Sequence, residues 1–195
     1  MRRLLEYGGY AAAVVLVLFG IGALVLSIQG KNTVTDSLKA EQIVGSPDMT
    51  PDEIEKAVQE AGLKDVDIPD CDVAGDTIDT GSEAKCFAEY MRIHALEASG
   101  GLTYAQMPRF ATDDGKGTND PEAASKDDKG APVSNAARNL WVTETALATA
   151  LNVSYMADQL GNFGIVVGIA LILAGVGFAI LAAAVLRARG GGAVT

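Results

Sequence analysis

The chain has 195 residues, of which 49% are hydrophobic, and its formal net charge is −10 at pH 7. Nucleic acids and anionic lipid surfaces attract basic patches, so this acidic balance argues against both as ligands. The single histidine, His94, excludes any metal site that needs two histidine ligands.

Two uncharged apolar runs stand near the ends of the chain, at residues 10–29 and 163–186. Each is close to the ~20 apolar residues that a helix needs to cross the hydrocarbon core of a bilayer. Inside lipid the backbone must satisfy its own hydrogen bonds, which a helix does. A cleaved signal peptide is the alternative for the first run, but no A-x-A-like cleavage site follows it. The sequence therefore predicts two transmembrane helices.

Basic residues predict how these helices are oriented. They flank both spans on the side of the chain ends, at Arg2, Arg3, Arg187 and Arg189. Basic residues close to a span favour the cytoplasmic side, so we expect both termini in the cytoplasm and the middle of the chain outside the plasma membrane. The predicted segments are a cytoplasmic N-terminus (1–9), a first span (10–29), an extracytoplasmic domain (30–162), a second span (163–186) and a cytoplasmic tail (187–195).

Both cysteines, Cys71 and Cys86, fall in the predicted extracytoplasmic part. Outside the reducing cytosol such a pair is typical of a disulfide. Closing a loop of this length stabilises a fold by ~3 kcal/mol in the chain-entropy model. The alternatives are two free thiols, or a redox pair, for which the C-x-x-C spacing is missing.

Two helices are predicted in the first half of this domain. The first covers residues 33–44, directly after the first span, and is stopped by the sequence Gly-Ser-Pro-Asp. The second covers Pro51–Ala61. Thr50 and Glu53 are spaced as a capping box, and Gly62 is placed to end the helix.

Residues 63–81 are expected to be irregular, with six aspartates at positions 65, 67, 70, 72, 76 and 79. The first interpretation is a solvated acidic loop and the second is a cation site, although the twelve-residue EF-hand pattern is absent. A third helix follows over Glu83–Ala98 with Ser82 as its cap. His94 lies on the apolar side of this helix and is expected to be packed in the core; the alternative is a ligand or a pH-sensitive contact.

The rest of the domain divides into a loop and a long helix. Residues 102–132 are dense in Gly, Asp and Lys and predict an exposed loop. The helix predicted over Ser134–Leu160 continues towards the second span. Glu144 lies near its apolar stripe, where an unpaired charge is costly. We expect it to form a buried ion pair, for which the candidate partners are Arg92, Arg109 and Arg138. The alternatives are simple exposure and, last, an acid/base role.

A strip of small residues lies on one side of the second span, at Gly164, Gly168, Gly175 and Ala179. Small residues let two membrane helices approach closely. The strip predicts packing against the first span, or against a second copy or another membrane protein. Neither span holds an ionisable residue, which argues against an ion or proton pathway.

Two stretches carry a family resemblance: TVTDSLKAEQIVGSPDMTPDEI at 33–54 and AARNLWVTETALATALNVSYMADQ at 136–159. With these next to its spans, the chain resembles a family of short actinobacterial membrane proteins with two spans and an outward central domain. The family's members are of unknown function, and some carry the label of an aromatic ring-opening dioxygenase. Such enzymes bind iron through two histidines and a carboxylate, a set that one histidine does not supply.

The sequence thus predicts an all-α membrane protein with a small helical extracytoplasmic domain between two spans. The function expected first is a non-enzymatic scaffold or accessory subunit of a membrane assembly in the cell envelope. An extracytoplasmic module that binds a ligand or cation is the alternative, and an enzyme is the third choice. No catalytic residue, cofactor or metal site is predicted. The expected partners are the lipid bilayer and either a second copy or another membrane protein.

Overall fold

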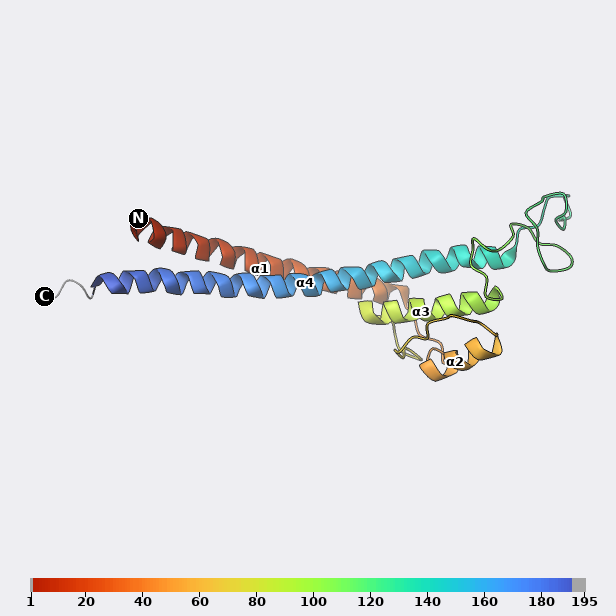
Figure 1. Cartoon of the computed structure of the whole chain (residues 1–195), viewed down its shortest axis with the longest axis horizontal. Helices are drawn as coiled ribbons and strands as arrows, with labels where there is room; N and C mark the ends of the chain where they lie inside the picture. The colour runs from red at the N-terminus through yellow and green to blue at the C-terminus, as the bar shows by residue number, and fades with distance from the viewer. Residues whose placement is uncertain (1, 191–195) are drawn as a thin grey trace. The chain divides into compact units, whose positions relative to one another are not determined.

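The computed structural model describes residues 2–190, and the side chains of residues 7–184. Within this range the regular elements are four helices: α1 (Arg2–Glu41), α2 (Pro51–Glu60), α3 (Gly81–Ala98) and α4 (Ala136–Gly190) (Figure 1). The predicted all-α class is confirmed. The chain divides into two compact units, which are Met1–Val34 with Ala157–Thr195 (the paired-helix unit) and Thr35–Met156 (the helical domain).

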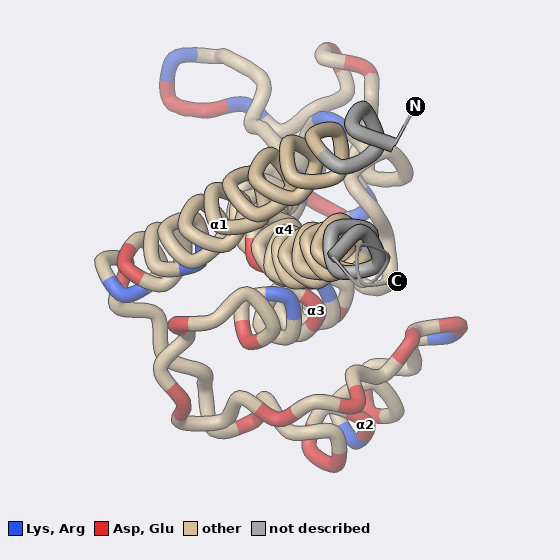
Figure 2. Tube along the Cα trace, turned by 90° about the vertical axis from the view of Figure 1, so that its left-hand side faces the viewer, with Lys and Arg blue, Asp and Glu red and all other residues tan. Residues whose placement is uncertain are grey.

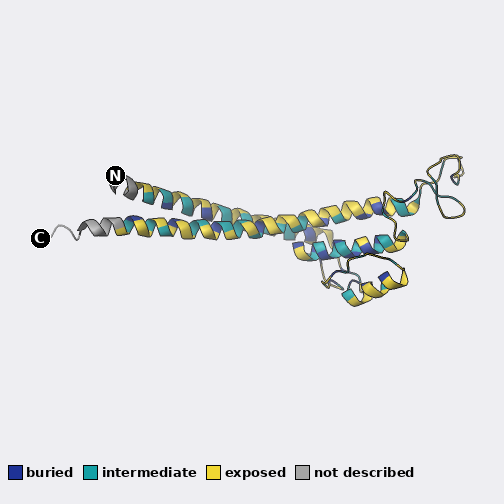
Figure 3. Cartoon of the chain, in the orientation of Figure 1, coloured by how far each residue is buried: buried dark blue, intermediate teal, exposed yellow. Residues whose placement is uncertain are grey.

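In the paired-helix unit, α1 and α4 run antiparallel side by side (Figure 1). Both are long and apolar enough to cross a membrane. Only 17% of the most apolar window of each is buried, so most of its residues are half-buried or exposed (Figure 3). Leu18 is 63% exposed and Leu173 is 66% exposed. That outward apolar surface suits lipid rather than water.

The first helix is longer than the sequence predicted. Residues 33–44 were expected to form a separate helix after a break near Gly30, but α1 continues unbroken to Glu41. A glycine inside a helix costs only about 1 kcal/mol, which the flanking helical residues can offset. Helix α1 ends where Gln42 adopts a positive φ of 54°. The four arginines that predict the orientation lie outside the residues whose side chains the structure describes.

The caps of α2 and α3 differ from the prediction in detail. Thr50 caps α2 by accepting the Glu53 N–H at 3.3 Å, but the Glu53 side chain pairs with Lys56 instead of closing the box. The complete capping box belongs to α3, between Thr80 and Glu83. Thr80, and not Ser82, is therefore the cap, because Glu83 then occupies the third helical position and reaches back to the Thr80 N–H at 2.9 Å.

The core of the helical domain forms where α2 and the chain before it meet α3. Residues 43–49 lie against residues 73–78, with a bridge between Val44 and Thr77. A Cβ on Gly45 would lie 1.7 Å from the Val73 carbonyl oxygen, so only glycine fits there. The largest fully buried side chains of this core are Ile54, Val73, Ile78 and Tyr90.

The predicted loop 102–132 is held by local contacts rather than by a core. Phe110 bridges to both Thr118 and Ser134, and Lys126 bridges to Pro132. Within the loop, only Met107 and Ala124 are buried. In Figure 2 acidic residues recur along the loops of the helical domain, whereas the described apolar stretches of the paired helices carry no charge.

Candidate functional site

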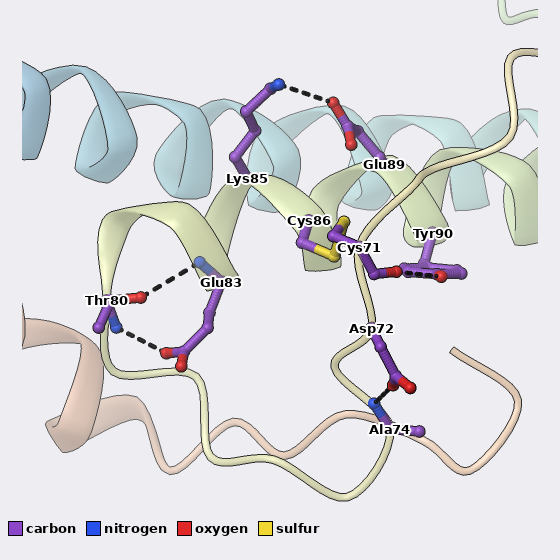
Figure 4. The surroundings of a disulfide bond; sticks show 9 residues. All are labelled: Cys71, Asp72, Ala74, Thr80, Glu83, Lys85, Cys86, Glu89 and Tyr90. Atoms are coloured by element: carbon purple, nitrogen blue, oxygen red, sulfur yellow. Dashed lines mark hydrogen bonds and ion pairs between the residues drawn. A yellow bond between two sulfur atoms is a disulfide. The ribbon is translucent and has the colours of Figure 1, made fainter. Parts of the chain in front are cut away.

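The disulfide fixes the acidic loop to α3, as the sequence predicted. Cys71 and Cys86 are bonded, with their Cα atoms 6.2 Å apart (Figure 4). One turn along α3, the Tyr90 hydroxyl donates a hydrogen bond of 2.6 Å to the Cys71 carbonyl oxygen. Burial raises the pKa of the Tyr90 phenol, so the hydroxyl keeps the proton that it donates. Together, the two links hold Cys71 against the helix.

The acidic loop 65–79, for which a solvated loop was the first interpretation and a cation site the second, forms turns and surface pairs. Asp72 accepts the Ala74 N–H at 2.9 Å, and Asp79 pairs with Lys39 at 3.4 Å. Among the described residues, no group of three or more His, Cys, Asp or Glu side chains is arranged to hold a metal ion.

His94 is not the core residue that its sequence position suggested. Its side chain is 31% exposed and lies between two carboxylates, 3.5 Å from Asp48 and 3.6 Å from Glu97. A hydrogen bond from Ser46, with a smaller contribution from His94, lowers the pKa of Asp48. The polar ring is therefore drawn to the acidic surface, while its neighbours Ile93 and Ala95 take the buried positions.

Helices α3 and α4 pack against one another in antiparallel order. Trp141 of α4 is buried with Ala95 and Met107, and its indole N–H donates to the Ser99 hydroxyl at 3.2 Å. Near the other end of α3, the Lys85 ammonium lies 5.5 Å from the centre of the Tyr155 ring of α4.

An apolar groove lies where the end of α1 joins α3 and α4. Its volume is about 570 Å³. Glu41 is the one ionisable side chain among its lining residues, which are Ser37, Leu38, Glu41, Ile43, Phe87, Met91, Leu147, Ala150, Leu151 and Ser154. Leu147 is 48% exposed and faces this groove, so a large apolar side chain is left open to a ligand or partner.

A second groove, the Glu144 groove, has a volume of about 380 Å³ and is lined by α3 and α4 alone. Glu144 is 5% exposed, and among the described residues it is the one charged residue that is buried. The expected ion pair is absent: no basic group of the described residues lies within 4 Å of Glu144, and only the Thr145 hydroxyl donates to it, at 3.2 Å. Arg92 lines the same groove, but its guanidinium lies over Trp141, 5.3 Å from the ring centre. Arg138 stacks on Tyr104 in the same way, at 4.1 Å.

The small-residue strip of α4 faces α1. A Cβ on Gly168 would lie 2.9 Å from the Gly20 carbonyl oxygen, and one on Gly175 would lie 2.9 Å from that of Ala13. At Gly164 it would meet the Ser27 hydroxyl. Ala179 is only half-buried, and the seam continues instead through Ala182, which is 4% exposed.

One cluster at the end of the seam was missed by the sequence reasoning. The Lys31 ammonium lies 2.7 Å from a carboxylate oxygen of Asp158 and donates to the Asn162 amide oxygen at 2.7 Å. The Asp158 side chain is 16% exposed. The sequence does contain a sign of this pair: Lys31 is the first charged residue after the first apolar run, and Asp158 is the last charged residue before the second.

Comparison with models of known protein families, with curated proteins and with solved structures finds no match to this chain.

Proposed function

We propose that this chain is a non-enzymatic integral membrane protein of the cell envelope, which assembles with another membrane component through its helical domain. The observation that carries the proposal is the apolar groove. An ordinary water-soluble domain rarely leaves a contiguous apolar hollow open to solvent, and such hollows mark sites of interaction.

The side of α4 outside the apolar groove supports the same proposal. From Ala136 to Met156 most of its residues are exposed (Figure 3). Val142, Val153 and Met156 are all more than half exposed. A helix that packs on one side only, and leaves large apolar side chains on the other, is suited to receive a partner helix.

The topology belongs to the proposal as well. Residues 10–29 and 163–186 span the plasma membrane, both ends lie in the cytoplasm, and the helical domain is extracytoplasmic. The disulfide supports this placement, because such bonds persist outside the reducing cytosol. Membership of the actinobacterial two-span family stays a prediction from residues 33–54 and 136–159.

Site-specific photo-crosslinking in native membranes tests the assembly. A photoreactive phenylalanine derivative at Leu147 lies in the apolar groove, whereas one at Lys129 lies in the exposed loop between α3 and α4. We expect Leu147 to yield one defined adduct, identified by mass spectrometry, with a membrane protein that also co-purifies with the unmodified chain. No adduct from Leu147, or adducts of equal yield from both positions, would contradict docking in this groove.

A further inference from the structure

The Glu144 carboxylate is buried without a basic partner, which is an unusual state for a charge. Removing a carboxylate from water is energetically costly unless a counter-charge or several hydrogen bonds replace the water. Here one hydroxyl, that of Thr145, donates to it. The carboxylate also lines an open groove, so a group from outside can reach it.

We infer that the Glu144 groove binds a basic side chain, a lysine ammonium or an arginine guanidinium, of the partner protein. This inference rests on the proposed function and names the chemistry by which the partner is recognised. Charge complementarity favours a basic partner segment, because residues 31–162 carry a net charge of −13. A cation that reaches Glu144 forms a charge-assisted hydrogen bond in a partly desolvated site.

The walls of the groove fit the rest of such a side chain. Ala88 and Ala148 are small and leave room for its entry, while Thr149 and Asn152 offer polar groups at the rim. Val153 and Met156 continue the α4 wall. The aliphatic stem of a lysine or arginine can lie on these apolar side chains with its charged head at Glu144.

Arg92 is the basic residue of this chain that lines the Glu144 groove, but its guanidinium contacts another side chain. Its guanidinium lies 5.3 Å from the centre of the Trp141 ring, an arrangement in which the cation is attracted by the aromatic face. Glu144 therefore stays available to a cation from outside.

The binding test uses the full-length protein in lipid nanodiscs and two probes, n-butylammonium and n-butylguanidinium, which mimic the two basic side chains. Trp141 is the only tryptophan, so its indole N–H gives a single assignable NMR signal within one helical turn of Glu144. We expect a saturable shift of this signal with either cation, and no saturable shift with neutral n-butanol.

Variants identify the group that binds. Glu144→Gln should weaken cation binding by about tenfold or more, since a charge-assisted hydrogen bond is lost. Glu97→Gln, an exposed carboxylate of α3 outside the groove, should leave the affinity unchanged. No saturable shift in the wild-type protein, or equal affinity in Glu144→Gln, would overturn the inference.

A photo-crosslinker at Thr149 connects the site to the partner. We expect its adduct to map to a partner peptide that contains a lysine or arginine, and to fall several-fold in Glu144→Gln while the adduct from Leu147 persists. If the Leu147 adduct forms and the Thr149 adduct does not respond to Glu144→Gln, this inference alone fails. If neither adduct forms, the proposed assembly fails with it.

Discussion

At the scale of single residues, Tyr90 is the buried side chain that positions the disulfide loop. Replacing it with phenylalanine removes the hydroxyl that donates to the Cys71 carbonyl oxygen. A buried acceptor without a donor costs about 1–3 kcal/mol. Tyr90→Phe should therefore lower the unfolding midpoint of the helical domain in thermal denaturation. Tyr155→Phe is the matched control, and an equal loss in both variants would contradict this role of the hydroxyl.

The same phenol predicts a pH dependence at alkaline pH. Burial raises the pKa of Tyr90 above its usual value of about 10. Between these two pKa values the unfolded chain releases the phenol proton and the folded chain keeps it, so stability falls as pH rises. The free energy of unfolding should decrease more steeply above pH ~10 in the wild type than in Tyr90→Phe. If the free energy of unfolding of the two proteins falls in parallel with pH, Tyr90 is not the source of this pH dependence.

Residue-level prediction from the sequence succeeded where the local pattern decides the outcome. Cys71 and Cys86 are bonded and Thr50 caps α2, since spacing and cap chemistry are local properties. It failed at His94 and at Glu144, because the neighbours of these side chains come from distant parts of the chain. Asp48, for instance, lies beside His94 only after α2 and α3 have packed.

At the scale of elements, the closest approach of α1 and α4 depends on glycine. A larger residue at Gly168 meets Leu24 and the backbone of Gly20, whereas nothing lies within 4 Å of a Cβ on Gly177. Gly168→Ile should weaken the pairing by about 1–3 kcal/mol, the usual effect of overpacking. Spin labels at Leu18→Cys and Leu173→Cys should show a broader distance distribution in Gly168→Ile. The distribution in Gly177→Ile should stay narrow, and broadening in both variants would contradict the seam.

The Lys31–Asp158 pair predicts a charge-swap rescue. Lys31→Asp places two carboxylates side by side and should destabilise the helix pair by about 1–2 kcal/mol. The double variant Lys31→Asp with Asp158→Lys restores an opposite-charge pair, so its thermal stability in detergent should return most of the way to the wild type. A double variant no more stable than Lys31→Asp alone would show that the cluster does not join the helices.

The sequence indicates that the two spans pack together, but it does not give the register of their packing. A strip of small residues indicates which side of α4 packs, and Gly164, Gly168 and Gly175 do lie against α1. The sequence predicts that the strip reaches Ala179, four residues after Gly175. In the structure the contact with α1 instead follows a seven-residue repeat through Gly161, Gly168, Gly175 and Ala182. A seven-residue repeat is what two helices with a left-handed crossing require, and the choice between the spacings depends on the partner helix.

At the scale of the whole molecule, the distribution of apolar and charged residues made the architecture predictable. Two long uncharged runs and an acidic middle give an all-α chain with two candidate membrane helices and a helical domain. The two grooves could not be predicted, because each is formed by side chains from helices that are far apart in the sequence. The continuity of α1 and of α4 was likewise not fixed, since a glycine can end a helix or lie within one.

The central claim is that the chain crosses the membrane twice and holds its helical domain outside the cytoplasm. Labelling of Lys129→Cys with a membrane-impermeant maleimide in intact cells tests this claim most directly. Lys129 is exposed in the loop between α3 and α4, and the native cysteines are paired and do not compete for the reagent. The account predicts equal labelling before and after the cells are permeabilised. Labelling that occurs only after permeabilisation would place the domain in the cytoplasm and contradict the account.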